Sequence, residues 1–144
     1  MEVFKVPAAQ VTPAIVLRHN AIILAMQQAF WDKYDIGKKK NVTHPLSGEP
    51  TKKNPALLDE KDGLEDPYSS AGLRKQLDRG TVVLACNLAL QDCIDLIKST
   101  DKVSDEVARK QAIAFLVPGV ILQPSGVFAA SLAQQAGAAY IKAS

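Results

Sequence analysis

Residues Thr81–Leu90, TVVLACNLAL, contain both halves of the unit from which the chain is built. The first half is an apolar, β-branched run with the length and composition of a buried strand. The second half opens an apolar pattern with helical spacing, so one element ends and the next begins near Cys86 and Asn87. Ligands gather beyond the carboxyl ends of parallel strands, so a thiol at this junction stands where chemistry is expected.

The same order of strand, polar junction and helix precedes this stretch. Residues 14–19, AIVLRH, predict a strand, and Asn20 is a plausible N-cap for a helix that runs to about Tyr34 and is closed by Gly37. Apolar residues within that helix recur at steps of three and four, which indicates one buried stripe. Trp31 and Tyr34, near its end, are interpreted as packing residues.

The order then continues to the end of the chain. Asn87 is expected to cap a helix that runs to about Lys98, and Ser104 to cap another that is stopped by Pro118 and Gly119. Residues 120–123, 124–126 and 127–135 predict a strand, a junction and a helix, and residues 138–141 an edge strand. Strands that alternate with helices predict an α/β fold, a mainly parallel sheet with helices on both faces.

Size and composition favour one globular domain over residues 1–144. The chain has 47% hydrophobic and 22% charged residues and a net charge of +2, which is typical of soluble proteins. Its apolar runs are far shorter than the ~20 residues that span a bilayer, and no signal peptide opens it. We therefore expect no membrane partner and, from the chain as given, a cytoplasmic location.

Residues 37–69 form a long irregular insertion in this pattern. The segment carries four prolines, two lysine clusters and an acidic run over residues 59–66. So long a connection is uncommon in a compact domain and is usually a lid, a binding loop, an oligomer arm or a disordered segment. The lysines have acidic residues nearby and no aromatic-rich strand beside them, so no nucleic-acid partner is predicted.

Motifs that would identify a cofactor or a metal are absent from the sequence. It contains no GxGxxG, no GxxxxGK[ST], no HExxH and no GxSxG. Its two cysteines are seven residues apart, which matches neither a redox CxxC pair nor a zinc knuckle. We expect no metal and no cofactor.

The candidate site consists of residues at the three strand ends: Cys86 as the reactive group, with Arg18, His19, Asn87 and Ser125 as binding residues. A helix N-terminus stabilises negative charge by up to ~1 to 2 kcal/mol, which favours a thiolate at Cys86 but only in part. A cationic neighbour, Arg18 or His19, is needed to go further. Cys86 as an inert buried residue is the alternative, and Cys93, beside the apolar stripe of its helix, is expected in the core.

Several segments in order resemble the DsrE-like sulfur-relay superfamily. They are residues 82–90, VVLACNLAL, then 116–120, LVPGV, 124–127, PSGV, and 134–141, QQAGAAYI. The earlier segments VLRH at 16–19 and WDKY at 31–34 are similar to an uncharacterised bacterial branch of that superfamily. The resemblance implies a homotrimer or homohexamer, and a cysteine at the position of Cys86 that carries persulfide sulfur.

The resemblance also has two departures. The first strand-helix unit that is usual in the superfamily has no counterpart ahead of residue 14, and the insertion at 37–69 is absent from the small relay subunits. Because related proteins of this branch often carry export signals, a periplasmic location is the alternative if such a signal precedes this sequence. The insertion argues against assembly with the usual relay partners.

Two hypotheses follow from these residues and this resemblance. In the first, the chain is a DsrE-like sulfur carrier in which Cys86 accepts and passes sulfane sulfur as a persulfide, with a sulfur donor or acceptor protein as partner. In the second, it is a non-catalytic protein of the same fold that binds a small anion in the same crevice or serves oligomer assembly. Whether the chain is an enzyme stays open at this point.

Overall fold

A three-stranded parallel sheet organises the protein. The computed structural model describes residues 11–141, and its strands are β1 (Ala14–Leu17), β2 (Val82–Cys86) and β3 (Ile121–Gln123), in the order β1-β2-β3. Leu17 pairs with Ala85 and Cys86 pairs with Gln123, so all three strands end at one edge of the sheet. The predicted α/β fold with a parallel sheet is confirmed.

The central strand β2 is the most buried part of the sheet. Its last four residues, from Val83 to Cys86, are buried, as expected for a strand with neighbours on both edges and cover on both faces. Its unbroken aliphatic run supplies apolar side chains to both faces. The strand therefore fixes the position of its last residue, Cys86, firmly in the middle of the sheet edge.

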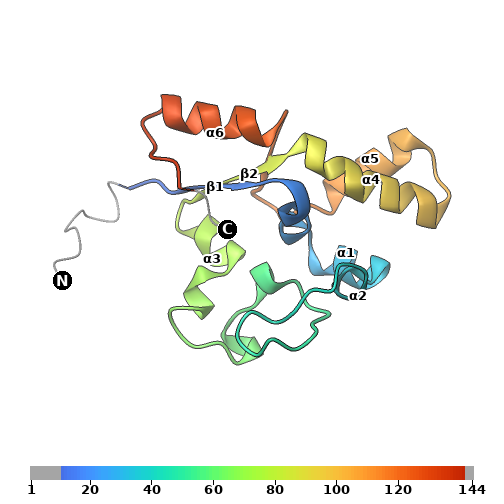
Figure 1. The fold of residues 1–144 in the computed structure, drawn as a ribbon, viewed down its shortest axis with the longest axis horizontal. Helices are drawn as coiled ribbons and strands as arrows, with labels where there is room; N and C mark the ends of the chain where they lie inside the picture. The colour runs from blue at the N-terminus through green and yellow to red at the C-terminus, as the bar shows by residue number, and fades with distance from the viewer. Residues whose placement is uncertain (1–10, 142–144) are drawn as a thin grey trace.

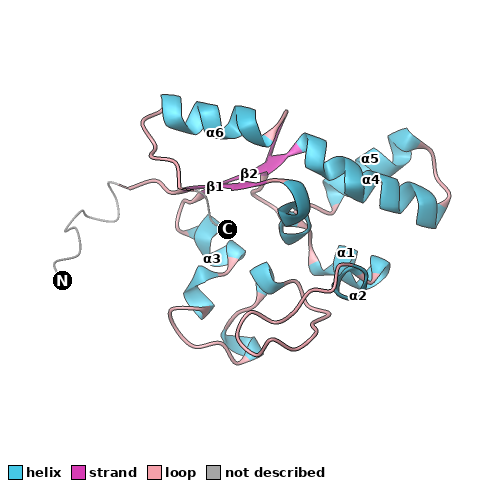
Figure 2. Ribbon diagram, viewed as in Figure 1, coloured by secondary structure: helices cyan, strands magenta, loops and turns pink. Residues whose placement is uncertain are grey.

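Helices lie on both sides of this sheet, as predicted. In Figure 1 helix α6 (Gly126–Gln135) runs along one side and helix α3 (Leu73–Asp78) lies on the other. Figure 2 shows that α4 (Asn87–Asp101) continues directly from β2, with α5 (Asp105–Ala114) packed beside it. Ser104 caps α5 as predicted, its hydroxyl accepting a hydrogen bond from the Val107 amide.

The single helix predicted from Asn20 to Tyr34 is wrong. The chain forms a 3-10 helix, η2 (His19–Ala25), then α1 (Gln28–Tyr34) and α2 (Ile36–Lys39). Asn20 lies inside η2, and the N-cap residue of η2 is Arg18. The helix breaks because the backbone on either side of Met26 pairs with residues 115–117. The Gln27 N–H donates to the Phe115 carbonyl, and the Ala25 carbonyl accepts from the Val117 N–H.

The predicted packing residues of this segment are nevertheless in the core. Met26, Phe30, Trp31 and Tyr34 are almost completely buried, and Ile23, the first residue of the predicted stripe, is partly buried. The ring of Phe30 packs against those of Tyr34 and Phe115, and the Trp31 indole donates to the carbonyl of Ile23 at 2.8 Å. The spacing of apolar residues thus predicted which side chains are buried, although the helix itself is divided.

The insertion at 37–69 packs against the rest of the protein. It contains short 3-10 helices, η3 (Pro55–Leu57) and η4 (Glu60–Asp62), and a third, η5 (Ser69–Ala71), overlaps its end. Asn54 is completely buried and its side-chain amide donates to the carbonyls of Leu24 and Met26, at 3.1 and 2.8 Å. These bonds fasten the insertion to the end of η2.

Two further predictions about chain ends and turns are wrong. Gly37 does not close a helix but lies within α2, where a Cβ atom would overlap the carbonyl oxygen of Thr51. Residues 138–141 form no strand: the chain turns at Gly137, with φ of 96°, after the end of α6, and continues without regular structure. Tyr140 and Ile141 are exposed.

Residues 1–10, which precede the expected first strand, lie outside the described part of the chain. Between residues 11 and 141, no helix has the length and apolar character needed to cross a membrane.

Candidate functional site

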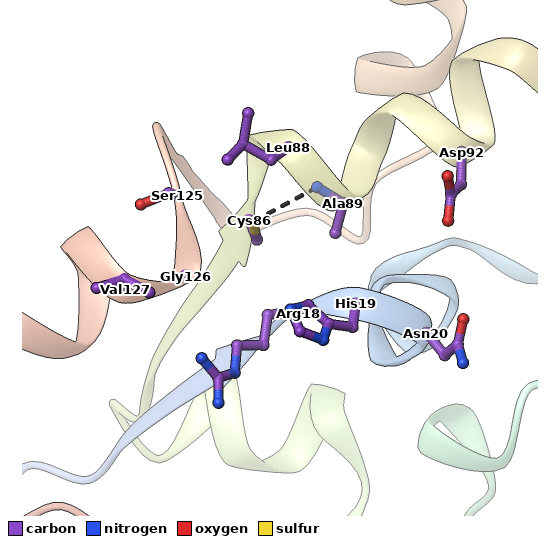
Figure 3. Close-up of a pocket in the computed structure, with 10 residues that line it drawn as sticks. All are labelled: Arg18, His19, Asn20, Cys86, Leu88, Ala89, Asp92, Ser125, Gly126 and Val127. Atoms are coloured by element: carbon purple, nitrogen blue, oxygen red, sulfur yellow. Dashed lines mark hydrogen bonds between the residues drawn. The ribbon is translucent and has the colours of Figure 1, made fainter.

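A pocket of about 350 Å³ lies at the carboxyl ends of the strands. Figure 3 shows it between the start of η2, the start of α4 and the start of α6. The lining residues are 18–20 after β1, Cys86, Leu88, Ala89 and Asp92 from the β2–α4 junction, and 125–127 at the start of α6. The structure therefore brings together four of the five predicted site residues, and this volume suits a small molecule.

Cys86 is both the last residue of β2 and the N-cap of α4. Its Sγ atom accepts a hydrogen bond from the backbone N–H of Ala89 at 3.4 Å (Figure 3). The residue is 5% exposed and lines the pocket. Its sulfur thus lies at the positive end of the dipole of a 15-residue helix and accepts an amide proton there.

Asn87 does not act as predicted. The helix begins immediately after the strand, so the cap position falls on Cys86 and Asn87 is the first helical residue. The Asn87 side-chain oxygen accepts a hydrogen bond from the Arg109 guanidinium at 2.7 Å, and Asn87 does not line the pocket. The pair links α4 to α5 beside the site. Arg109 carries no local signal that would have identified it from the sequence.

Arg18 and His19 both line the pocket, but neither contacts the sulfur. In Figure 3 the Arg18 side chain extends along β1 with its guanidinium pointing away from Cys86. Within residues 11–141 neither side chain forms a hydrogen bond or an ion pair. His19 has a φ of 51°, a conformation that costs energy for a residue other than glycine and that sets its ring at the rim of the pocket.

Gly126 determines the path of the Arg18 side chain. A Cβ atom at Gly126 would lie 2.8 Å from Cβ and 3.0 Å from Cδ of Arg18. Arg18 can therefore cross the start of α6 only because residue 126 has no side chain. The sequence predicts Gly126 as part of a junction between a strand and a helix. Its contact with Arg18 could not be predicted, because it depends on the order of the strands in the sheet.

Ser125 is the N-cap of α6, and its hydroxyl accepts a hydrogen bond from the Phe128 amide at 3.0 Å. The first backbone N–H groups of a helix have no intrahelical partner, so those of Gly126 and Val127 are free to donate at the pocket. Two helix N-termini, of α4 and α6, thus meet at one site. This arrangement favours an anionic group between them.

Asp92 is a lining residue that the sequence interpretation missed. It follows Cys86 and Ala89 at steps of three along α4, which places all three on one side of the helix. That spacing is the signal that could have found it. Asp92 lies at the end of the pocket away from the Arg18 guanidinium (Figure 3).

The second cysteine is a core residue, as predicted. Cys93 is 3% exposed, and burial, with the Asp92 carboxylate as a smaller cause, raises the pKa of its thiol to about 12. A thiol in that state is neither a nucleophile nor a ligand near neutral pH. Among residues 11–141, no group of three His, Cys, Asp or Glu side chains could hold a metal ion.

No protein-family model matches this chain, and no match is found among curated proteins or among solved structures. Conclusions about function therefore depend on the geometry of the Cys86 pocket.

Proposed function

We propose that the protein is a sulfur carrier in which Cys86 holds sulfane sulfur as a persulfide. The observation that carries this proposal is the position of the Cys86 sulfur, which lines the pocket and accepts the Ala89 N–H at the start of α4. The resemblance of residues 82–90 and 124–127 to the DsrE-like superfamily supports the same chemistry. Both observations concern the same edge of the sheet.

The transfer conserves atoms and electrons without any external oxidant. The Cys86 thiolate attacks the outer sulfur of a donor persulfide, so a new S–S bond forms on Cys86 while the S–S bond of the donor breaks. The donor leaves as a thiolate and takes up the proton. An acceptor thiolate then attacks the outer sulfur on Cys86, which restores the Cys86 thiol.

The pocket supplies two sources of stabilisation for the anionic sulfur. The N-terminus of α4 acts on the inner sulfur through the Ala89 amide, and the free amides of Gly126 and Val127 lie across the pocket. Each helix terminus contributes ~0.3 to 1 kcal/mol in partly exposed surroundings. Arg18 adds positive potential at the rim rather than a direct contact.

The direct test is to incubate the reduced protein with inorganic polysulfide and to measure intact mass after trapping with an alkylating reagent. We expect one added sulfur atom on Cys86 in the wild type and in Cys93→Ser, and none in Cys86→Ser. A folded wild-type protein whose Cys86 gains no sulfur would show that the proposal is wrong. Slow alkylation of Cys86 at neutral pH would point the same way.

A specific feature of α6 favours a second candidate function, assembly with copies of the same chain. This helix turns small residues, Gly126 and Ala129, toward the sheet and leaves Val127, Phe128 and Leu132 exposed by 66, 46 and 43%. Residues 111–141 contain no charged side chain. A two-fold contact brings like residues together, so a charge-free apolar face is suited to it.

Sedimentation equilibrium tests the assembly. We expect the wild type to self-associate and Phe128→Lys to be monomeric, because the lysine would bring two positive charges into the contact. Val107→Lys is the control, since Val107 is exposed to a similar degree, 42%, but lies on α5. A wild type that stays monomeric at its highest soluble concentration, or an equal effect of both variants, would exclude this role for α6.

A further inference from the structure

The two ends of the Cys86 pocket carry opposite charges. Arg18 and Asp92 line it at opposite ends, and Cys86 and His19 lie between them (Figure 3). In the part of the chain from residue 11 to 141, neither charged side chain takes part in an ion pair or a side-chain hydrogen bond. Each charge is therefore free to meet a ligand.

This charge pattern selects among the ligands that could bring sulfur to Cys86. A simple anion would satisfy Arg18 and the helix N-termini but would be repelled at the Asp92 end. A ligand with a single positive charge would leave Arg18 unpaired. A dipolar ligand, with a carboxylate at one end and an ammonium group at the other, satisfies both ends at once.

The order of the groups along the pocket favours a peptide over a single α-amino acid. Its ammonium and carboxylate groups are attached to one carbon atom, whereas Arg18 and Asp92 lie at opposite ends of the pocket. A short peptide carries its ammonium and carboxylate groups at opposite ends, which matches this order. With a cysteine in its middle, such a peptide places its sulfur between the charged ends, where Cys86 lies.

We propose that the sulfur donor or acceptor of Cys86 is a short dipolar peptide thiol, its carboxylate at Arg18 and its ammonium group near Asp92 and Asn20. This inference rests on the proposed function of Cys86 and specifies its substrate class. In the donor direction the peptide persulfide gives its outer sulfur to the Cys86 thiolate and leaves as the peptide thiol. The pocket of about 350 Å³ lies within the size range of small-molecule sites.

Binding can be measured without any sulfur transfer. The probe is the tripeptide glycyl-cysteinyl-glycine with a methylated sulfur, titrated into the reduced wild-type protein and followed by nuclear magnetic resonance. Two analogues remove one charge each, by acetylation of the amine or amidation of the carboxylate. Because exposed ion pairs contribute ~0.2 to 1 kcal/mol, we expect each change to weaken binding by up to about 5-fold.

Variants assign each charge to its partner. In Asp92→Asn acetylation of the probe should no longer matter, and in Arg18→Gln amidation should no longer matter, while Arg18→Lys keeps the preference for the free carboxylate. Asp95→Asn is the matched control, because Asp95 lies on the same helix outside the pocket lining. It should bind all three peptides as the wild type does.

The results separate this inference from the proposed function. A protein that takes sulfur from polysulfide but binds the three peptides equally, or does not bind the parent peptide, keeps the carrier function and overturns the peptide ligand. An effect of Asp95→Asn equal to that of Asp92→Asn overturns it as well. A protein that discriminates the peptides as expected but gains no sulfur supports the dipolar ligand and overturns the carrier function.

Discussion

Cys86 and Cys93 belong to one helix and its cap, yet their surroundings give them opposite properties. Cys86 ends a strand, accepts an amide proton and lines a pocket, while Cys93 is enclosed by the core two helical turns later. Since the thiolate is the reactive form, the raised pKa of Cys93 makes that thiol inert near neutral pH. The difference arises from position in the fold, not from residue type.

The buried thiol of Cys93 predicts a loss of stability in alkaline solution. Its pKa is raised from the ordinary value of 9.0 to about 12, so between these values the folded state binds the proton more tightly than the unfolded state. Stability is therefore fully present below about pH 9 and falls as the pH rises, by at most ~1.4 kcal/mol per pH unit from this group. Urea unfolding of the wild type and Cys93→Ala across this range should show a shallower decline for the variant.

Urea unfolding of the same two proteins near neutral pH is the control for this prediction. Near pH 7 the two proteins should differ only by a constant cost of the substitution, because the thiol is protonated in both the folded and the unfolded state. Equal slopes of stability against pH above pH 9 would contradict the assigned burial of Cys93.

Asn54 is the residue whose loss we expect to damage the fold most directly. Its amide donates to the carbonyls of Leu24 and Met26 and its oxygen accepts from the Ala56 amide. Asn54→Ala leaves these buried groups without partners, which should lower the free energy of unfolding by about 3 kcal/mol. Gln134→Ala, on the exposed side of α6, should change it by no more than about 0.5 kcal/mol.

Thermal and urea unfolding measure Asn54→Ala and its control, Gln134→Ala. A loss at Asn54→Ala no larger than that at Gln134→Ala would show that the insertion is not fastened through this side chain.

At the scale of the elements, the junctions between strands and helices set the site. The start of α6 lies against β1 because Gly126 leaves room for Arg18, and the start of α4 follows β2 without a linker. Short, direct junctions hold the two helix N-termini at one edge of the sheet. A longer connection at either point would move its amides away from the pocket.

Gly126→Ala should disturb this contact. The added Cβ atom would lie 2.8 Å from Cβ of Arg18, which is fixed to the backbone and cannot rotate away. Overpacking of this kind costs ~1 to 3 kcal/mol, which exceeds the gain in helix propensity at a first helical position, so we expect a net loss of about 1 kcal/mol. Urea unfolding measures this loss in the free energy of unfolding.

The partner variant makes this prediction specific. In Arg18→Gly the clashing atoms are absent, so Gly126→Ala should then be neutral or stabilising. The same loss in both backgrounds would mean that Arg18 is not what Gly126 accommodates.

At the scale of the whole molecule, the insertion belongs to the folded unit rather than to a lid or an arm over the pocket. No residue of 37–69 lines the Cys86 pocket, and Leu57 from the insertion packs into the core. Lys53 forms an ion pair with Asp62, and Lys75 pairs with Glu60, which connects the insertion to α3. The insertion therefore packs against the rest of the domain and does not cover the pocket.

Limited digestion with trypsin tests this view of the insertion. Although Lys52, Lys53 and Lys61 are potential cleavage sites, we expect the folded wild type to resist cutting there, because a protease needs local unfolding to bind the chain. Asn54→Ala should become sensitive at these lysines. Rapid cleavage after Lys53 in the folded wild type would show a loosely attached insertion.

The local pattern of residues was sufficient for strands β1, β2 and β3, for the cap of α5, and for Cys86 at a strand end. These features depend on neighbours within a few positions, through side-chain period and capping chemistry. The strand over residues 138–141 and the unbroken helix from Asn20 failed for the opposite reason. Pairing of Met26 with Leu116 and the turn at Gly137 depend on the course of the chain as a whole.

The pocket shows the same division. TVVLACNLAL placed Cys86 at the start of a helix, because an aliphatic strand and a helical apolar pattern meet there. Arg18 and Ser125 lie beside it only because the strands have the order β1-β2-β3. Cys86 rather than Asn87 is the N-cap because α4 follows β2 without a linker. Contacts between segments that are distant in sequence depend on how the strands pack, which no local pattern records.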